Sequence, residues 1–134
     1  MPPTDDARID GPVLIVDDDP DIREVLAEAL VDLGFEVVTA VHGRDALTLL
    51  ARMAVPPSAI LLDLMMPIMD GYGFLEERTK DGALRSIPLA IVTAGHGIDR
   101  ARIGADTTIV RKPFDMDLLV RVLRSMQTGA ERQA

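Results

Sequence analysis

The chain has 134 residues, which is enough for one domain with a single core. Its net charge of -8 argues against a general nucleic-acid surface, and the absence of cysteine excludes disulfides, thiolate metal sites and cysteine nucleophiles. No apolar run is long enough to span a bilayer, and the first residues lack the pattern of a signal peptide, so we expect a cytoplasmic protein without membrane insertion.

The first predicted elements are a loose arm, a strand and a helix. Residues 1–11 are polar and interrupted by proline, which predicts the arm. The wholly apolar run at 13–16 predicts a strand that is covered on both faces, as in parallel sheets. Asp19 is a typical N-cap, Pro20 fits a first turn and Gly34 is a typical stop, so a helix is expected between them. Its apolar face is predicted to contain Ile22, Val25, Leu26, Ala29, Leu30 and Leu33.

The rest of the chain continues the alternation of strands and helices. The pattern predicts strands at 36–39, 60–62, 89–92 and 107–110, helices at 44–53, 72–80 and 116–126, and a loose tail at 128–134. Between 94 and 106, glycines leave little room for a helix. This order predicts a doubly wound α/β fold around a five-stranded parallel sheet, in which ligands bind beyond the carboxyl ends of the strands.

Carboxylates, a hydroxyl and an ammonium group follow the predicted strands. Asp17 and Asp18 end the first strand, and Asp63 ends the third. Thr93 ends the fourth strand, and Lys112 follows the fifth. Each residue alone has an ordinary structural explanation, as a loop acid, a β-branched strand residue or a solvated charge. Their joint position at one rim of the sheet instead predicts a functional site.

The three carboxylates predict a site for a hard cation. Neighbouring carboxylates repel one another, and a divalent ion together with the ammonium group of Lys112 would offset that repulsion. Mg²⁺ suits a few carboxylates completed by water better than Ca²⁺ does. Such a site can accept a phosphoryl group, with Asp63 as the nucleophile, Lys112 as a point charge and Thr93 as a hydroxyl donor.

Four stretches of the sequence resemble the receiver domain of bacterial two-component response regulators. They are VLIVDDDPDIRE, ILLDLMMPIMDGYGFL, AIVTA and RKPF, in the order and at nearly the spacing of that family. The resemblance implies one receiver domain over residues 12–127. It also implies a flavodoxin-like fold with strand order 2-1-3-4-5, which is the order of the family and does not follow from the spacing.

The resemblance implies a role for each acidic residue at the rim. Asp63 would be the phosphoacceptor and would also bind Mg²⁺. Asp18 would be a direct Mg²⁺ ligand, and Asp17 would act through water. The backbone carbonyl of Met65 would complete the protein ligands.

The resemblance also implies how the module would be used. Thr93 would be the switch hydroxyl, and Lys112, next to a cis bond to Pro113, would contact the phosphoryl group. We expect a single-domain module that receives a phosphoryl group from a histidine kinase or a phosphotransfer protein. It would act on a downstream protein target or relay the group, without direct contact to nucleic acid. It would not be an enzyme for outside substrates, since it would catalyse only its own phosphorylation and slow dephosphorylation.

Two departures from the family pattern keep an alternative open. The family usually has Tyr or Phe three residues before the lysine, where this chain has Ile109, and the segment 94–106 is shorter than usual by about one helical turn. These changes favour an alternative in which the domain is a phosphorylation-independent interaction platform. A phosphohydrolase of the haloacid dehalogenase type is disfavoured, because Met65 stands where that family has a second aspartate.

Overall fold

A five-stranded, entirely parallel sheet forms the centre of the molecule. The computed structural model describes residues 11–133, with side chains through Met126, so the expected arm lies outside the described residues except for Gly11. The strands are β1 (Val13–Val16), β2 (Val37–Ala40), β3 (Ala59–Leu62), β4 (Leu89–Thr93) and β5 (Thr108–Arg111). Their order is β2-β1-β3-β4-β5, with every pairing parallel, which confirms the predicted fold class.

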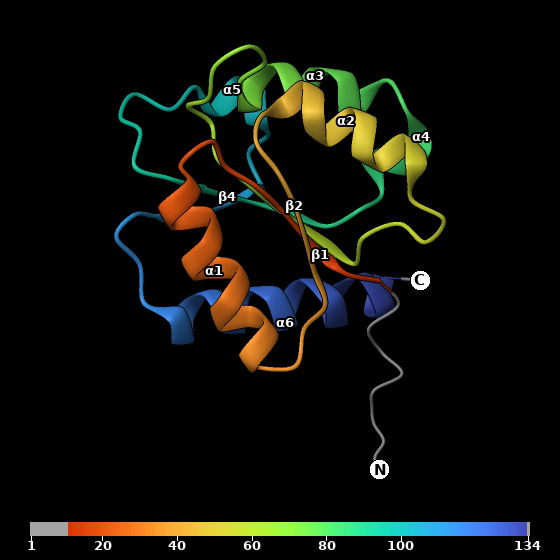
Figure 1. The fold of residues 1–134 in the computed structure, drawn as a ribbon. Coiled ribbons are helices and arrows are strands. Elements are labelled where there is room, and N and C mark those ends of the chain that lie inside the picture. Colours follow the sequence, from red (N-terminus) through yellow and green to blue (C-terminus); the bar gives the residue numbers. More distant parts are fainter. Residues whose placement is uncertain (1–10, 134) are drawn as a thin grey trace.

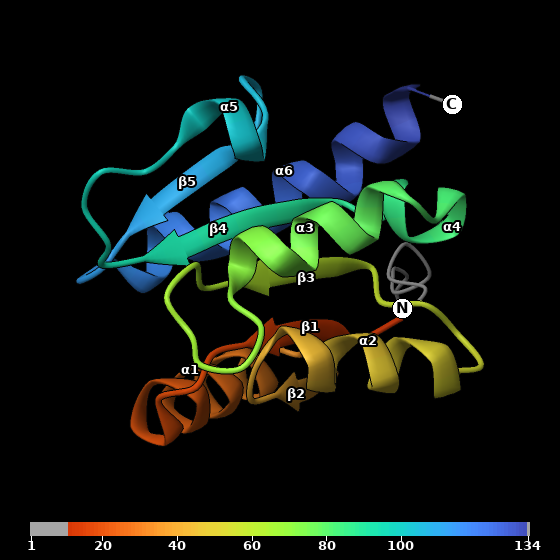
Figure 2. The same ribbon diagram turned by 90° about the horizontal axis from the view of Figure 1, so that it is seen from above.

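Helices cover both faces of the sheet. They are α1 (Pro20–Asp32), α2 (Gly43–Arg52), α3 (Gly71–Thr79), α4 (Gly82–Arg85), α5 (Arg100–Ile103) and α6 (Met116–Gln133). Figure 1 shows α1 and α6 on one side of the sheet and α2, α3, α4 and α5 on the other. Figure 2 shows the strand arrowheads pointing the same way, toward the loops that carry the predicted site. Within residues 11–133, no helix has the length and apolar character needed to cross a bilayer.

The sheet separates two apolar layers. Along β1, Leu14 and Val16 contribute to the layer under α2, α3 and α5, while Val13 and Ile15 contribute to the layer under α1 and α6. All four side chains are buried, which explains why the run is wholly apolar and does not alternate with polar residues.

The first helix begins and ends as its sequence predicts, but its buried face is narrower. Asp19 is the N-cap and Pro20 the first residue, and Gly34 follows the helix with φ 98°, a left-handed conformation that glycine adopts without strain. Leu26 and Leu30 are fully buried on the inner face. The predicted inward positions Val25 and Leu33 are instead exposed. Val25 lies at the edge of the apolar stripe, about 100° from Leu26, and Leu33 is the C-cap residue after the end of the helix.

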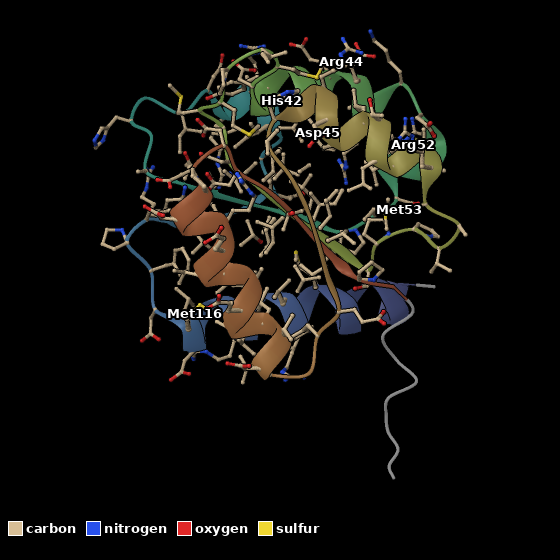
Figure 3. All side chains as sticks on the ribbon, viewed as in Figure 1. His42, Arg44, Asp45, Arg52, Met53 and Met116 are labelled. Atoms are coloured by element: carbon tan, nitrogen blue, oxygen red, sulfur yellow. The ribbon has the colours of Figure 1, made fainter. Side chains whose placement is uncertain are left out.

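A reciprocal pair of hydrogen bonds starts the second helix. His42 Nδ1 accepts the N–H of Asp45 at 3.1 Å, and Asp45 Oδ2 accepts the N–H of Val41 at 2.9 Å. Figure 3 shows His42 and Asp45 together at one end of α2, with Arg52 at the other. This arrangement is a variant of the capping box, with histidine in the place of serine or threonine and with Asp45 bonded to the residue before the N-cap.

The remaining helices depart most from the predictions. The four-residue α4 was not expected, and the glycine-rich segment after β4 forms only the single turn α5. The last helix begins at Met116 as predicted, after Asp115 accepts the N–H of Asp117 at 2.8 Å. It continues to Gln133, so the expected end at Met126 was wrong, and the expected tail from 128 starts within this helix.

Ile68, in the loop after β3, has an unfavourable backbone conformation. Its φ is 69°, and its side chain is 82% exposed, so the left-handed backbone is not offset by burial. We expect Ile68→Asn to raise the free energy of unfolding by about 1 kcal/mol, because asparagine tolerates this conformation better than a β-branched residue. Denaturant unfolding followed by circular dichroism measures the change. Ile68→Val, which keeps the β-branch, should give no gain, and an equal gain would contradict the explanation.

Candidate functional site

The first strand ends in an acidic turn whose three consecutive aspartates have different surroundings. Asp17 is 3% exposed, and its Oδ1 accepts the N–H of Asp19 at 2.9 Å. Asp18 is exposed at the rim. Asp19 caps α1 by accepting the N–H groups of Asp21 and Ile22. The three adjacent carboxylates therefore serve separate purposes. Asp17 and Asp18 join a cluster with Asp63 and Lys112, which we call the pocket, and Asp19 starts the helix.

Asp63 comes next to this turn because β1 and β3 are neighbours in the sheet. Its N–H donates to the carbonyl of Val16 at 3.0 Å, and its side chain is buried, with 7% of the residue exposed. One carboxylate oxygen from each of Asp17, Asp18 and Asp63 can be chosen so that all three lie within 4.8 Å of one another. Carboxylate oxygens gathered in this way could hold one hard divalent cation, as the sequence predicted.

Lys112 brings the positive charge of the pocket from β5. Its Nζ donates to Asp17 Oδ2 at 2.7 Å and lies 3.6 Å from Asp63 Oδ2, so it forms ion pairs with both carboxylates. Burial lowers the pKa of the ammonium group, but the hydrogen bond to Asp17 and the two negative charges outweigh burial and leave this pKa above its ordinary value. The Lys112–Pro113 peptide bond is cis, as the resemblance implied.

Asp63 holds its proton more tightly than an ordinary aspartate. Burial is the largest cause of its raised pKa, and the nearby charge of Asp17 adds to it. The Thr93 hydroxyl, the charge of Lys112 and the backbone N–H of Met65 act in the opposite direction without cancelling the increase. The carboxylate therefore lies in a pocket that disfavours its charged form.

This raised pKa predicts a pH-dependent stability difference between wild type and Asp63→Asn. The folded protein binds the Asp63 proton more tightly than the unfolded chain does. Protonated Asp63 therefore contributes stability that is fully present below the ordinary pKa of 3.8 and is lost as pH rises through the pKa of the folded state. Without Mg²⁺, we expect Asp63→Asn to be more stable than wild type by about 1–2 kcal/mol near neutral pH. The advantage should shrink as the pH is lowered toward about 4.

Denaturant unfolding of both proteins across this pH range measures the difference. Asp18→Asn is a matched control, because Asp18 is exposed and its substitution should give a smaller change. A constant difference between wild type and Asp63→Asn at all pH values would contradict the assignment of the raised pKa to Asp63.

Thr93 and Met65 border the carboxylate of Asp63. Thr93 ends β4, is fully buried, and its Oγ accepts the N–H of Gly95 at 3.1 Å. The N–H of Met65 donates to Asp63 Oδ1 at 3.3 Å, while the Met65 side chain is largely exposed. A Cβ added at Gly95 would come within 3.3 Å of the Met65 side chain, so these residues approach each other at the mouth of the pocket.

The loop after Asp63 returns sharply to the sheet at Gly71. The N–H of Gly71 donates to the carbonyl of Leu64 at 3.0 Å, and Asp70 caps α3 by accepting the N–H of Gly73 at 2.9 Å. A Cβ at Gly71 would lie 2.6 Å from the carbonyl oxygen of Asp63, so only glycine fits. The same loop contacts α2, since the carbonyl of Met69 accepts the N–H of Gly43 at 2.9 Å.

Two arginines support the site in ways that the sequence did not predict. Arg23 of α1 donates to the backbone carbonyl of Asp17 at 2.8 Å, which fixes the end of β1. Arg111 donates to the carbonyl of Gly95 at 3.0 Å, next to Thr93. Both bonds use backbone acceptors, so no pattern of side-chain types in the sequence could indicate them. The side chains of Asp17, Asp18, Asp63, Thr93 and Lys112, by contrast, meet at one rim as the strand-end rule predicted.

Comparisons with known proteins agree with this geometry. The model of the response regulator receiver domain family matches residues 13–124. The probable transcriptional regulator ycf27 of Porphyra purpurea is 38% identical over 124 residues, which is 90% of this chain and 49% of that protein. Response regulator Rre1 of Synechocystis is 34% identical over 119 residues, covering 85% of this chain and 50% of the relative. The chain thus spans about half the length of these curated relatives.

A solved structure has the same arrangement of elements. The chemotaxis response regulator CheY4 of Vibrio cholerae superimposes with a TM-score of 0.75 at 28% identity, covering 87% of this chain and 98% of that protein.

Proposed function

Because the chain belongs to the response regulator receiver domain family, we propose that it accepts a phosphoryl group on Asp63 and that the transfer is controlled by a signalling partner. The single observation that carries this proposal is the buried Asp63 carboxylate, which lies beside two further carboxylates and the ammonium group of Lys112. A histidine kinase or a phosphotransfer protein would be the donor. The transfer would shift the population of two conformations and so change binding to a downstream protein.

Each residue of the pocket has a defined task in this proposal. An oxygen of Asp63 attacks phosphorus in line with the leaving group, and Lys112 neutralises charge on the phosphoryl oxygens. The Thr93 hydroxyl, now an acceptor for Gly95, would turn to donate to the phosphoryl group. Because Lys112 Nζ already lies 3.6 Å from Asp63 Oδ2, little rearrangement is needed to bring positive charge to the reacting oxygens.

The donor set fits a bound Mg²⁺ ion. Asp18 and Asp63 would bind it directly, Asp17 through water, and the Met65 backbone carbonyl would complete the protein ligands. When bound, the ion would neutralise charge on the transferring oxygens. Asp17 is the least available ligand, since its two oxygens already accept from Asp19 and Lys112, which supports its assignment to contact through water.

The pocket also supports slow loss of the phosphoryl group. Met65 and Gly95 approach each other at its mouth, and neither side chain has a polar group that could orient an attacking water. Position 65 also has no carboxyl group that could act as a second acid, because it is methionine. This argues against turnover of outside phosphoesters. We therefore propose that the domain catalyses only its own phosphorylation and slow dephosphorylation.

Incubation with acetyl phosphate and Mg²⁺ tests the proposal. We expect intact-mass analysis to show one added phosphoryl group on wild type and none on Asp63→Asn, because the amide cannot act as the nucleophile. Chelation of the metal should prevent the addition. Equal masses for both proteins, with or without acetyl phosphate, would contradict a phosphoacceptor role for Asp63.

A second candidate function is a phosphorylation-independent interaction platform. It is favoured by Ile109 at the usual aromatic position and by the single-turn helix α5. Binding to a partner with equal affinity by wild type, phosphorylated protein and Asp63→Ala would support the platform over the switch. The ycf27 relatives are described as probable transcriptional regulators, but they are about twice as long as this chain. Their description as transcriptional regulators therefore does not indicate what this domain acts on.

A further inference from the structure

Tyr72 links the loop that follows Asp63 to the segment that follows Thr93. It lies in the first turn of α3, immediately after Gly71. Its hydroxyl accepts the backbone N–H of Asp99 at 2.9 Å, across 27 positions of sequence. Asp99 is the N-cap residue of α5, and its own side chain makes no capping hydrogen bond. The Tyr72 hydroxyl therefore holds the first turn of α5 in place through this hydrogen bond.

Arg102 and Glu76 reinforce this link. The guanidinium group of Arg102 lies 4.5 Å from the centre of the Tyr72 ring, a cation–π geometry. It also pairs with Glu76 at 2.7 Å. Because Glu76 is four residues after Tyr72, both side chains lie on the same face of α3. We call Tyr72, Glu76, Asp99 and Arg102 the tyrosine clamp.

Both ends of the tyrosine clamp are connected to the pocket. On the α3 side, Gly71 is held to Leu64, the residue after Asp63, by a backbone hydrogen bond of 3.0 Å. On the α5 side, the chain runs back from Asp99 to Gly95, whose N–H donates to the Thr93 hydroxyl oxygen. The Thr93 hydroxyl interacts with Asp63 while its oxygen accepts the N–H of Gly95. A rotation of Thr93 toward a phosphoryl oxygen on Asp63 would lengthen the bond to Gly95 and so release the start of the segment.

Ile109 cannot provide an equivalent link. Its apolar side chain packs partly buried against the same layer as Tyr72 and Ile98, and it has no group that can hydrogen-bond the segment. Among the described residues, Tyr72 provides the aromatic hydroxyl that contacts the segment between Thr93 and α5.

We propose that Tyr72 is a positioning residue that couples Asp63 to the segment 94–103, and that phosphorylation weakens its hydrogen bond to Asp99. The proposal rests on the proposed function, since it requires a phosphoryl group to attract the Thr93 hydroxyl. Weakening this bond changes the position of α5 relative to α3. The surface that these two helices form together changes with it. The readout thus passes through α3, although Ile109 on β5 lacks the aromatic ring.

The chain contains a convenient reporter for this test. Tyr72 is the only tyrosine and there is no tryptophan, so ultraviolet-excited emission comes almost entirely from the tyrosine clamp. With Mg²⁺ and acetyl phosphate, we expect the emission of wild type to change in proportion to the phosphorylated fraction measured by intact mass. Asp63→Asn should show no change. A phosphorylated fraction that rises while emission stays constant would overturn the coupling and leave the proposed function intact.

Hydrogen exchange tests the hydrogen bond without relying on phosphorylation. In the unphosphorylated protein, Tyr72→Phe keeps the ring and its contact with Arg102 but removes the acceptor for the Asp99 N–H. We expect exchange of the Asp99 amide to accelerate about tenfold. The Phe74 amide, bonded to the Asp70 carbonyl at 3.0 Å, should be unchanged. Equal Asp99 exchange in the two proteins would overturn the role of Tyr72.

The two measurements separate the coupling from the proposed function. If wild type takes up no phosphoryl group, the proposed function and the coupling both fail, and Asp99 exchange still decides whether Tyr72 holds α5. If phosphorylation occurs, the wild-type Asp99 amide should exchange faster in the phosphorylated protein. Unchanged exchange would again overturn the coupling.

Discussion

Replacing Lys112 with methionine is expected to lower the free energy of unfolding by about 3 kcal/mol in Mg²⁺-free buffer. The reason is that Lys112 is the ammonium partner of two buried carboxylates, at 2.7 Å from Asp17 and 3.6 Å from Asp63. Methionine preserves most of the volume but leaves those charges without compensation. Denaturant unfolding followed by circular dichroism measures the loss.

Added Mg²⁺ should restore part of the lost stability, since a cation among the carboxylates replaces the missing charge and binds only the folded state. The other lysine of the chain provides a matched control. Lys80 is exposed and pairs with Glu77 on the surface at 3.1 Å, so Lys80→Met should change stability by less than about 1 kcal/mol. Similar losses in the two variants, or no response of Lys112→Met to Mg²⁺, would contradict the electrostatic explanation. We also expect Lys112→Met to take up phosphoryl groups much more slowly than wild type.

Replacing Gly71 with alanine is expected to destabilise the protein by about 2–3 kcal/mol. The added Cβ would lie 2.6 Å from the carbonyl oxygen of Asp63 and 2.7 Å from the Cα of Leu64. Both neighbours are backbone atoms, so they can yield only if the loop that carries Asp63 moves. We therefore expect phosphorylation by acetyl phosphate to be impaired together with stability.

Gly82→Ala is the matched control for this prediction. Its Cβ would meet only the end of the Arg85 side chain at 3.8 Å, in the first turn of α4. Because alanine favours a helix more than glycine does, this variant should be neutral or more stable by up to about 1 kcal/mol. Comparable losses at both glycines would contradict the close-contact explanation for Gly71.

The pocket was predictable because its residues lie at the end of a strand or within two residues of it, and the sequence makes most of these strands plain. Wholly apolar runs end at Asp17, Asp63 and Thr93, and parallel strands place their carboxyl ends at the same edge. Lys112 was found in the same way, after the weaker run of β5. The order of the strands came from the resemblance, since strand patterns alone do not determine which strands pair.

Other features depend on contacts that no local pattern encodes. The short helix α4 has a local N-cap in Asp81, but its far end is held by Arg78, which donates to the carbonyls of Arg85 and Ile87, seven and nine residues further on. The bond between Tyr72 and Asp99 joins a side chain to a backbone group far along the chain. Helical propensity and periodicity describe neighbours three or four residues apart, so they do not predict hydrogen bonds between residues far apart in the sequence.

The division of the core by the sheet has a consequence for how this protein can evolve. Gly43, Gly71 and Tyr72 join α2, α3 and α5 to the loops of the pocket, and these helices share one apolar layer. Residues such as Leu119 and Leu123, on the buried face of α6, lie in the opposite layer. Conservative changes there should alter cellular abundance through global stability while leaving signal transmission untouched. Inherited variation in partner choice should instead accumulate on the helices of the first layer.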